Sequence, residues 1–451
     1  MAVWSLAKLQ SAVETRRIDA DYYRPEYLRV AELLSWAAPL KQFVQEIIHP
    51  AEFERRYAEN GWRVVRTQNV RPLRMDFDSN EVFLSEEVAS YLFKNHLRSG
   101  DILITRTGAN FGQCSLYYGE EKPALATSHT FNVRTNEKID SAYLALFLNT
   151  KQGRLLIDRG MYGSSQPEIA PRFLLRIPTP KFDNNTETEL AAFVRKAYDQ
   201  RKKSVSLFAE AQQIIESELG LDKLKFKKPV GYTGRFSTVG LSDAFNAGRI
   251  DAQCFSPNAI FYESWLRDHN QCDSLNHLLE AKIKGRQQEE TEKGSIDYCS
   301  IKHISGHEMT DAPKCLPTSD TPLATQNNLL LAITGATIGK IGVVKRYKQL
   351  AFSGDLLCLK ISPGIDPHYL LVVLDHTIGQ VQFNRWITGS TNGHLAPRDV
   401  GRVLVPRFKN SIETRIAELV EESLKKRLES EKLLEQAKAR VEQLIEEVAA
   451  Q

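Results

Sequence analysis

The sequence lacks the short motifs that identify a bound cofactor or a catalytic metal. No two prolines are adjacent, and no two glycines are separated by a single residue. These absences remove the Asn/Asp-Pro-Pro-aromatic motif of amino-methyltransferases and the glycine-rich loop of dinucleotide-binding folds. The HExxH pattern of zinc enzymes is also missing. We therefore expect a chain that binds no cofactor and no metal and that is not itself an enzyme.

Paired cysteines and long apolar runs are missing as well. The six cysteines are scattered without a CxxC pair, which argues against a zinc site or a disulfide framework. No apolar run reaches about 18 residues and no signal peptide is present, so we expect no membrane span and a reducing cytoplasm as the compartment. The net charge is only +3 over 451 residues. Any affinity for nucleic acid must then come from local basic patches.

What the sequence does contain is a long internal repeat. Residues 17–20 (Arg-Ile-Asp-Ala) recur at 249–252, an offset of 249 − 17 = 232. Later matches have offsets of 227 and then 226: 107–109 with 334–336, 139–140 with 365–366, 143–144 with 369–370, 163–164 with 389–390, 170–171 with 396–397, and 180–182 with 406–408. Ordered matches with slowly shrinking offsets indicate one unit that occurs twice.

Each copy ends in a segment typical of a long helix, from Glu187 and from Glu413 onward, rich in Ala, Leu, Glu, Lys and Arg. Heptad spacing gives two matching stripes, and their larger members are Val194, Arg201, Phe208 and Ile215 in the first copy and Val420, Arg427, Leu434 and Val441 in the second. Such stripes predict an antiparallel coiled coil with a pseudo-twofold internal repeat. Packing of each helix only on its own domain is the alternative.

Short apolar runs predict strands at 101–105, 115–118, 328–333 and 341–344, and helices are expected at 143–150 and 369–377. The fold class is therefore mixed α/β (α+β). The expected domains are a first α/β domain (1–184), a first long helix (185–220), a linker (221–238), a second α/β domain (239–410) and a second long helix (411–451).

Two patterns imitate functional sites. Residues 335–340 (Gly-Ala-Thr-Ile-Gly-Lys) resemble a phosphate-binding loop, but only three residues separate the glycines and Ile341 follows the lysine. The phosphate loop requires four residues there and a Ser or Thr after the lysine, so a tight strand-to-strand turn is the better interpretation. His303 and His307 flank Ser-Gly, which favours a pair of loop histidines over a metal site.

Basic and amide side chains gather on expected loops in both copies. Arg, Gln and Asn suit the edges of guanine and adenine, and Arg and Lys also contact phosphates. For any one of these residues, a solvated charged surface is the alternative. The candidate DNA-contacting residues are Arg63, Arg66, Gln68, Asn69, Arg71, Arg106, Ser165 and Gln166 in the first copy and Lys284, Arg286, Gln287, Lys302, His303, Thr391 and Asn392 in the second.

The order of the repeated segments resembles that of the DNA-specificity subunit of Type I restriction-modification systems. The resemblance rests on 100–104 with Thr107-Gly108, 163–166 with Ala170-Pro171, 177–180, and their counterparts 328–331, 389–392, 395–397 and 403–406. It implies two target-recognition domains that each read half of a split site in double-stranded DNA. It also implies a coiled coil that spaces them and docks two methyltransferase subunits, which restriction subunits can join.

Three alternatives stay open at this point. The first is a specificity-like subunit of another phage-defence system, because the opening at 17–23 also occurs in such proteins. The second copy also has Asn327-Asn328 where the first has Gly-Asp. A self-contained enzyme that modifies or cleaves DNA is the second alternative. A helical scaffold whose α/β domains bind protein is the third.

Overall fold

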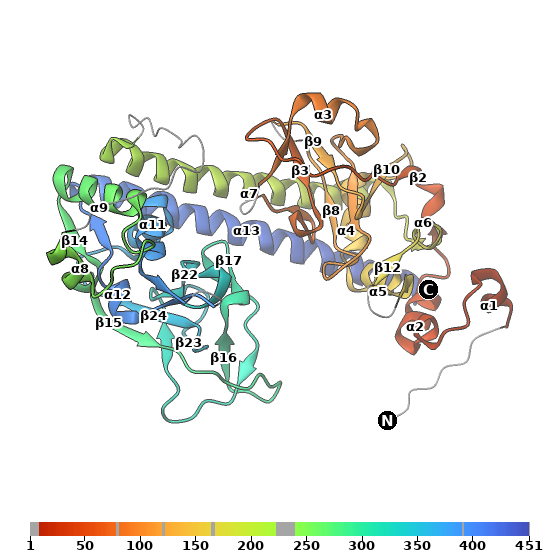
Figure 1. The fold of residues 1–451 in the computed structure, drawn as a ribbon. Coiled ribbons are helices and arrows are strands. Elements are labelled where there is room, and N and C mark those ends of the chain that lie inside the picture. The colour runs from red at the N-terminus through yellow and green to blue at the C-terminus, as the bar shows by residue number, and fades with distance from the viewer. Residues whose placement is uncertain are drawn as a thin grey trace. The chain divides into compact units, whose positions relative to one another are not determined.

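The computed structural model describes residues 9–77, 81–119, 122–163, 167–221, 240–389 and 392–450 (Figure 1). The chain divides into two compact units: unit 1 (Met1–Arg201 and Leu428–Gln451) and unit 2 (Lys202–Arg427). Two long helices, α7 (Asn184–Leu219) and α13 (Asn410–Ala449), each contribute one half to each unit. Each unit is therefore an α/β body packed on two half helices.

The body of unit 1 is built on a four-stranded sheet of order β2-β10-β7-β8 and a three-stranded sheet of order β6-β3-β9. The strands of these two sheets are β2 (Val44–Ile48), β3 (Trp62–Val65), β6 (Phe83–Leu84), β7 (Ile102–Thr105), β8 (Cys114–Leu116), β9 (Ala124–Ala126) and β10 (Thr130–Thr135). Three two-stranded ladders complete the strands: β1 (Ala38–Pro39) with β13 (Pro178–Thr179), β4 (Val70–Arg71) with β5 (Arg74–Met75), and β11 (Met161–Tyr162) with β12 (Glu168–Ile169). The helices of this body are α1 (Leu9–Thr15), α2 (Pro25–Leu33), α3 (Glu86–Ser90), α4 (Ser141–Leu148), α5 (Lys151–Arg159) and α6 (Pro171–Leu174).

Unit 2 repeats this plan. Its six-stranded sheet has the order β15-β24-β21-β22-β18-β17, and its four-stranded sheet has the order β19-β16-β23-β20. The strands are β14 (Cys272–Ser274), β15 (Leu279–Lys284), β16 (Ile296–Cys299), β17 (Ile304–Ser305), β18 (Glu308–Met309), β19 (Lys314–Cys315), β20 (Leu323–Thr325), β21 (Leu329–Ala332), β22 (Ile341–Val343), β23 (Gln349–Phe352), β24 (Leu356–Ile361), β25 (Ile387–Thr388), β26 (His394–Leu395) and β27 (Leu404–Pro406). The helices are α8 (Leu241–Ala247), α9 (Pro257–His269), α10 (Pro367–Asp375), α11 (Thr377–Trp386) and α12 (Pro397–Val400).

The two bodies share one topology. The order β2-β10-β7-β8 corresponds to β15-β24-β21-β22, and the parallel pair β3/β9 corresponds to β16/β23. One difference lies in the hairpin β17/β18, which joins the main sheet of unit 2 through β22, whereas β4/β5 of unit 1 forms a ladder of its own. The predicted fold class, mixed α/β with two long helices, is confirmed.

The repeated glycine turns also behave as the sequence predicts. Gly335 and Gly339 both have positive φ angles, 76° and 92°, in the connection between the antiparallel strands β21 and β22. Gly108 and Gly112 take the same left-handed conformation, with φ of 86° and 68°, between β7 and β8. Glycine adopts this conformation without steric cost, so the turn that imitates a phosphate loop is a tight strand connection.

The repeated Arg-Ile-Asp-Ala motif anchors the start of each body. The guanidinium of Arg17 pairs with Asp19 at 2.7 Å and donates to the backbone oxygen of Met161 at 2.7 Å. Arg249 likewise pairs with Asp251 at 2.7 Å and donates to the oxygen of Ile387 at 3.1 Å. In both units the arginine lowers the pKa of the paired aspartate. The motif is therefore a structural clamp between the start of the body and the strand that follows α5 or α11.

A second repeated pair of contacts attaches the body to the long helix. The hydroxyl of Tyr143 donates to the oxygen of Pro180 at 3.0 Å, and that of Tyr369 donates to Pro406 at 2.6 Å. The carboxylate of Glu413, at the start of α13, accepts hydrogen bonds from the backbone of Phe408 and the guanidinium of Arg407. Lys181, Phe182 and Glu187 make the equivalent contacts at the start of α7.

Inside unit 2 the half helices run antiparallel. The Ser423 hydroxyl donates to the backbone oxygen of Ser204 at 2.7 Å, and Arg415 pairs with Glu210 at 3.0 Å. Residue numbers that increase along α7 therefore meet residue numbers that decrease along α13. The buried stripe residues of this unit also join the core of the α/β body: Phe208, Ile215 and Val420.

Unit 1 contains the same contact. The Ser430 hydroxyl donates to the backbone oxygen of Ala197 at 2.6 Å. Under the repeat offset of 226, Ala197 corresponds to Ser423 and Ser204 corresponds to Ser430, so the two contacts join equivalent pairs of positions, with the donor on α13 in both. The remaining predicted stripe residues lie on these helices: Val194 and Val441 are buried in the core of unit 1, Leu434 packs against that core, Arg427 is buried and Arg201 is half-buried. The predicted antiparallel pairing of the long helices is confirmed.

All six cysteines are free. In the described ranges no three His, Cys, Asp or Glu side chains gather as metal ligands. None of the helices in those ranges combines the length and the apolar character that crossing a bilayer requires.

Replacing Ser423, the small side chain where α13 contacts Ser204 of α7, with a large one should separate the half helices. Ser423 is 3% exposed, so Ser423→Leu places a large side chain where the helices meet. Overpacking and the lost hydrogen bond together should lower the free energy of unfolding by about 2–4 kcal/mol. Urea unfolding measures this change. Lys425→Leu, at an exposed position of the same helix, is the control, and an equal effect of both variants would contradict the close contact.

Candidate nucleic-acid interface

Three loops of unit 1 meet where strands β3, β7 and β9 end. Since β3 and β9 pair in parallel, with Val65 opposite Ala126, their carboxyl ends share one edge. The loop after β7 joins them: the Arg106 amide donates to the oxygen of His129 at 2.8 Å, and the Asn110 side chain donates to Thr67 at 3.4 Å. The loops at 66–69, 106–112 and 127–129 therefore form one surface.

The same convergence occurs in unit 2, where β16 and β23 are the parallel pair. The Ile333 amide donates to the oxygen of Asp355 at 2.9 Å, and the Lys340 ammonium donates to the oxygen of Ile301 at 3.3 Å. A further loop, after β15, packs here as well, because the Arg286 amide donates to the oxygen of Phe352 at 3.0 Å. The segment 392–393 joins them, because the Gly335 amide donates to the oxygen of Gly393 at 3.0 Å. We call the loop surface of each unit its reading edge; in unit 2 it comprises 284–287, 300–303, 334–340, 353–355 and 392–393.

In unit 1 four of the predicted residues lie on this edge or beside it with side chains at least partly exposed. Gln68 is exposed, and Arg66, Arg71 and Arg106 are half-buried. Arg71 donates to the Asn110 side chain at 3.4 Å, and Arg106 pairs with Glu168 at 3.2 Å and contacts the His49 ring. These guanidinium groups are thus held in place by neighbouring side chains, which orders them before a ligand binds.

In unit 2 five of the predicted residues on this edge reach the surface. Lys284, Arg286, Gln287, Lys302 and Asn392 are all exposed. Lys302 pairs with Glu290 at 3.1 Å and Arg286 pairs with Asp320, and both are pairs between exposed side chains. Exposed pairs of this kind contribute little to stability and exchange easily for other partners such as phosphate.

Other predicted residues lie elsewhere. Arg63 is near the start of β3, 14% exposed, where it pairs with Glu81 and lies over the ring of Phe77 at 4.2 Å. The structure therefore does not bring Arg63 to the reading edge. Ser165, Gln166 and Thr391 lie outside the described residues.

Asn69 and His303 have a structural role that the sequence does not reveal. They occupy the same place in the two bodies, and both are buried. The Asn69 side-chain oxygen accepts from the Arg66 amide at 2.9 Å, while Nδ1 of His303 accepts from the Ser300 amide at 3.0 Å. Each side chain thus closes the short helical turn that presents Gln68 or Lys302.

Sequence reasoning missed several residues of this edge: Asn110 and His129 in unit 1, and Thr334, Lys340 and Asp355 in unit 2. Asn110, Thr334 and Lys340 belong to the glycine turns that the repeat had already identified. The repeat does not identify His129 and Asp355, because they follow short strands, β9 and β23, for which the sequence gives no periodic signal.

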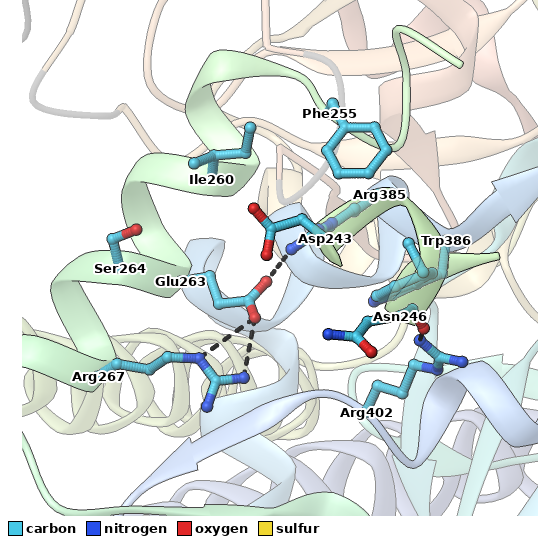
Figure 2. A pocket seen from close by; sticks show the side chains of 11 residues that line it. Asp243, Asn246, Phe255, Ile260, Glu263, Ser264, Arg267, Arg385, Trp386 and Arg402 are labelled. Carbon is cyan, nitrogen blue, oxygen red and sulfur yellow. Dashed lines mark hydrogen bonds and ion pairs between the residues drawn. The ribbon is translucent and has the colours of Figure 1, made fainter. Parts of the chain in front are cut away.

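A separate pocket of about 510 Å³ lies in unit 2 among α8, α9 and the end of α11 (Figure 2). Glu263 accepts from Arg267 at 2.9 Å and also contacts Arg385, while Arg402 lies over the ring of Trp386 and donates to the oxygen of Asn246 at 2.9 Å. In unit 1, Arg176 makes the equivalent contact with the oxygen of Glu14. We conclude that these arginines hold the helices together.

The chain is similar to solved specificity subunits. One is the S subunit of a Type I restriction-modification system from M. genitalium, with 12% identity, a TM-score of 0.41, and coverage of 91% of this chain and 94% of that one. Another is the HsdS subunit from Thermoanaerobacter tengcongensis, with 12% identity, a TM-score of 0.29, and coverage of 91% and 95%. No family model matches the sequence, and no curated protein matches it. At such low similarity, the function has to be inferred from the chain's own residues.

Because His303 is buried, we expect the stability of the protein to depend on pH. Burial, with a smaller contribution from Lys302, lowers the pKa of His303 below its usual value. The folded state then binds fewer protons than the unfolded state, so stability falls as the pH drops through about 6.5. His303→Asn keeps an acceptor, as Asn69 does in unit 1, and should remove part of this loss, up to about 1.4 kcal/mol per pH unit for one group.

Urea midpoints between pH 7.5 and 5.5 measure the effect. His277→Asn, at an exposed position, serves as the control and should leave the pH profile unchanged. Parallel profiles for the wild type and His303→Asn would show that His303 does not titrate on unfolding.

Proposed function

We propose that this protein is the sequence-specific DNA-recognition subunit of a Type I restriction-modification system. The observation that carries this proposal is the pair of reading edges. Each unit brings loops together at the carboxyl ends of its parallel strand pair, on the same backbone frame and with different polar and basic side chains. A shared frame with different contact residues is what two domains need in order to read two different half-sites.

The local chemistry supports DNA as the ligand. Lys284, Arg286 and Lys302 in unit 2, and Arg66 and Arg106 in unit 1, supply positive charge at the edges although the whole chain carries only +3. Such groups bind phosphates, and the exposed amides Gln68, Gln287 and Asn392 can read base edges. In this proposal the long helices space the two domains; 36 residues of α7 correspond to a length of about 54 Å.

The proposal assigns catalysis to partners. Two methyltransferase subunits would dock on the paired helices, and restriction subunits would join that complex. This division fits a sequence without a cofactor loop or a methyltransferase motif. A specificity-like subunit of another phage-defence system would share the reading edges and differ in its partners.

Selection from a library of random duplex DNA tests the recognition role. We expect two short specific segments separated by a fixed number of unspecified base pairs, because two units each read a few bases. A single contiguous motif, or no enrichment, would contradict the proposal.

A matched pair of lysine variants locates the contact surface. Lys302→Ala, at the reading edge, should weaken DNA binding and reduce the slope of log affinity against log salt by about one. Lys348→Ala should leave both unchanged, because Lys348 precedes β23 and so lies at the other end of that strand. Equal effects of the two variants would place the DNA elsewhere on unit 2.

Native mass spectrometry of the complex purified from its own cells tests the partners. We expect two copies of a DNA methyltransferase per chain, because the contact between the half helices occurs once in each unit. Recovery of the chain with a different enzyme class would transfer it to another defence system, and recovery without partners would contradict docking.

A further inference from the structure

One position at the reading edge carries a carboxylate in unit 2 and an imidazole in unit 1. Asp355 directly precedes β24 and His129 directly precedes β10, an offset of 226. Their backbone oxygens accept from equivalent amides, those of Ile333 and Arg106, at 2.9 and 2.8 Å. The two residues therefore occupy the same place on the shared frame.

A threonine supports the side chain in both cases. The Thr334 hydroxyl donates to Oδ1 of Asp355 at 2.6 Å, and the Thr107 hydroxyl lies 3.1 Å from Nδ1 of His129. This hydrogen bond orients Asp355 and leaves its second oxygen, Oδ2, without a hydrogen-bond partner among the described residues. Because Asp355 is exposed, Oδ2 can accept from a ligand.

Two loops that carry basic side chains connect to the segment just before Asp355. The loop that carries Lys284 and Arg286 packs against 352–354, where Gly285 approaches the oxygen of Ser353 so closely that a Cβ at Gly285 would lie 2.1 Å from it. The Ser353 amide donates to Cys299, which ends the strand before the turn that carries Lys302. An exposed carboxylate here repels phosphate, whereas an amino group on a base edge can donate to it.

We propose that Asp355 is a specificity-determining residue that accepts a hydrogen bond from the N4 amino group of a cytosine in the half-site bound by unit 2. The proposal rests on the DNA-recognition role given above. Cytosine presents a donor without an adjacent acceptor in the major groove, whereas the donor of adenine lies beside the N7 acceptor. A carboxylate with one available oxygen therefore prefers cytosine.

Duplex selection with the full chain tests this role. The wild type should enrich a cytosine at one position of one half-site. Asp355→Ala should lose the preference at that position while the rest of both half-sites stays unchanged. Asp268→Ala, which removes an exposed carboxylate of α9, is the matched control and should reproduce the wild-type motif.

A modified base tests the same contact without altering the protein. Replacing the selected cytosine with 2-pyrimidinone deoxyribonucleoside removes only the N4 amino group. Wild-type affinity should fall roughly 5- to 150-fold, the range for one good base contact, and the affinity of Asp355→Ala should not change. The Asp355→Ala arm corrects for the hydrogen bond to guanine O6 that the same amino group makes within the base pair. If wild-type affinity does not fall, the contact is absent whether or not the variant folds.

The outcomes separate the two proposals. A bipartite motif that Asp355→Ala leaves intact, or wild-type binding that ignores the missing amino group, overturns the role of Asp355 and retains DNA recognition. A wild-type chain that enriches no motif overturns the recognition function itself.

Discussion

The close packing of two helices through small side chains is the constraint on which both units depend. Ser423 meets Ser204 in unit 2, and Ser430 meets Ala197 in unit 1. The serine hydroxyls donate to backbone oxygens of the facing helix, so a shift in register would leave them buried without a partner. Each α/β body then packs on the pair of half helices, and the core of each unit includes residues from both. The register of the helices thus fixes what each body packs against.

Much of the fold could be predicted because its signals are local or repeated. The stripe from Val194 to Ile215 and its copy indicate helices by spacing alone, and the glycine turns at Gly108 and Gly335 mark strand connections. The parallel pair β3/β9 could not be predicted, since both strands are short and lie far apart in sequence. That pair creates the reading edge of unit 1, so the place where the candidate residues meet required the structure.

The residue types of the candidate site could be predicted from the sequence, whereas the exposure and role of individual residues could not. Gln68 and Asn69 are neighbours with the same amide chemistry, yet Gln68 is exposed and Asn69 is buried, where it closes the turn. An amide that can read adenine can equally bind backbone, and only the path of the chain decides between these roles. His303 illustrates the same point with a different side chain, since its ring replaces the amide of Asn69 at the equivalent turn. The frame therefore tolerates substitution wherever the hydrogen-bond geometry is preserved.

The division of both long helices between the units has a consequence for synthesis on the ribosome. Unit 2 is a continuous stretch, Lys202–Arg427, and holds all of its core residues when that stretch has emerged. Unit 1 instead needs Ala437, Val441 and Ile445 to cover Leu190 and Val194, although its body is translated first. Unit 1 can therefore complete its core only after unit 2 has been translated, whereas in the usual order the N-terminal domain folds first. The nascent first body must keep an apolar surface uncovered throughout synthesis of the second, which makes this interval the one in which chaperone binding and misassembly compete with folding.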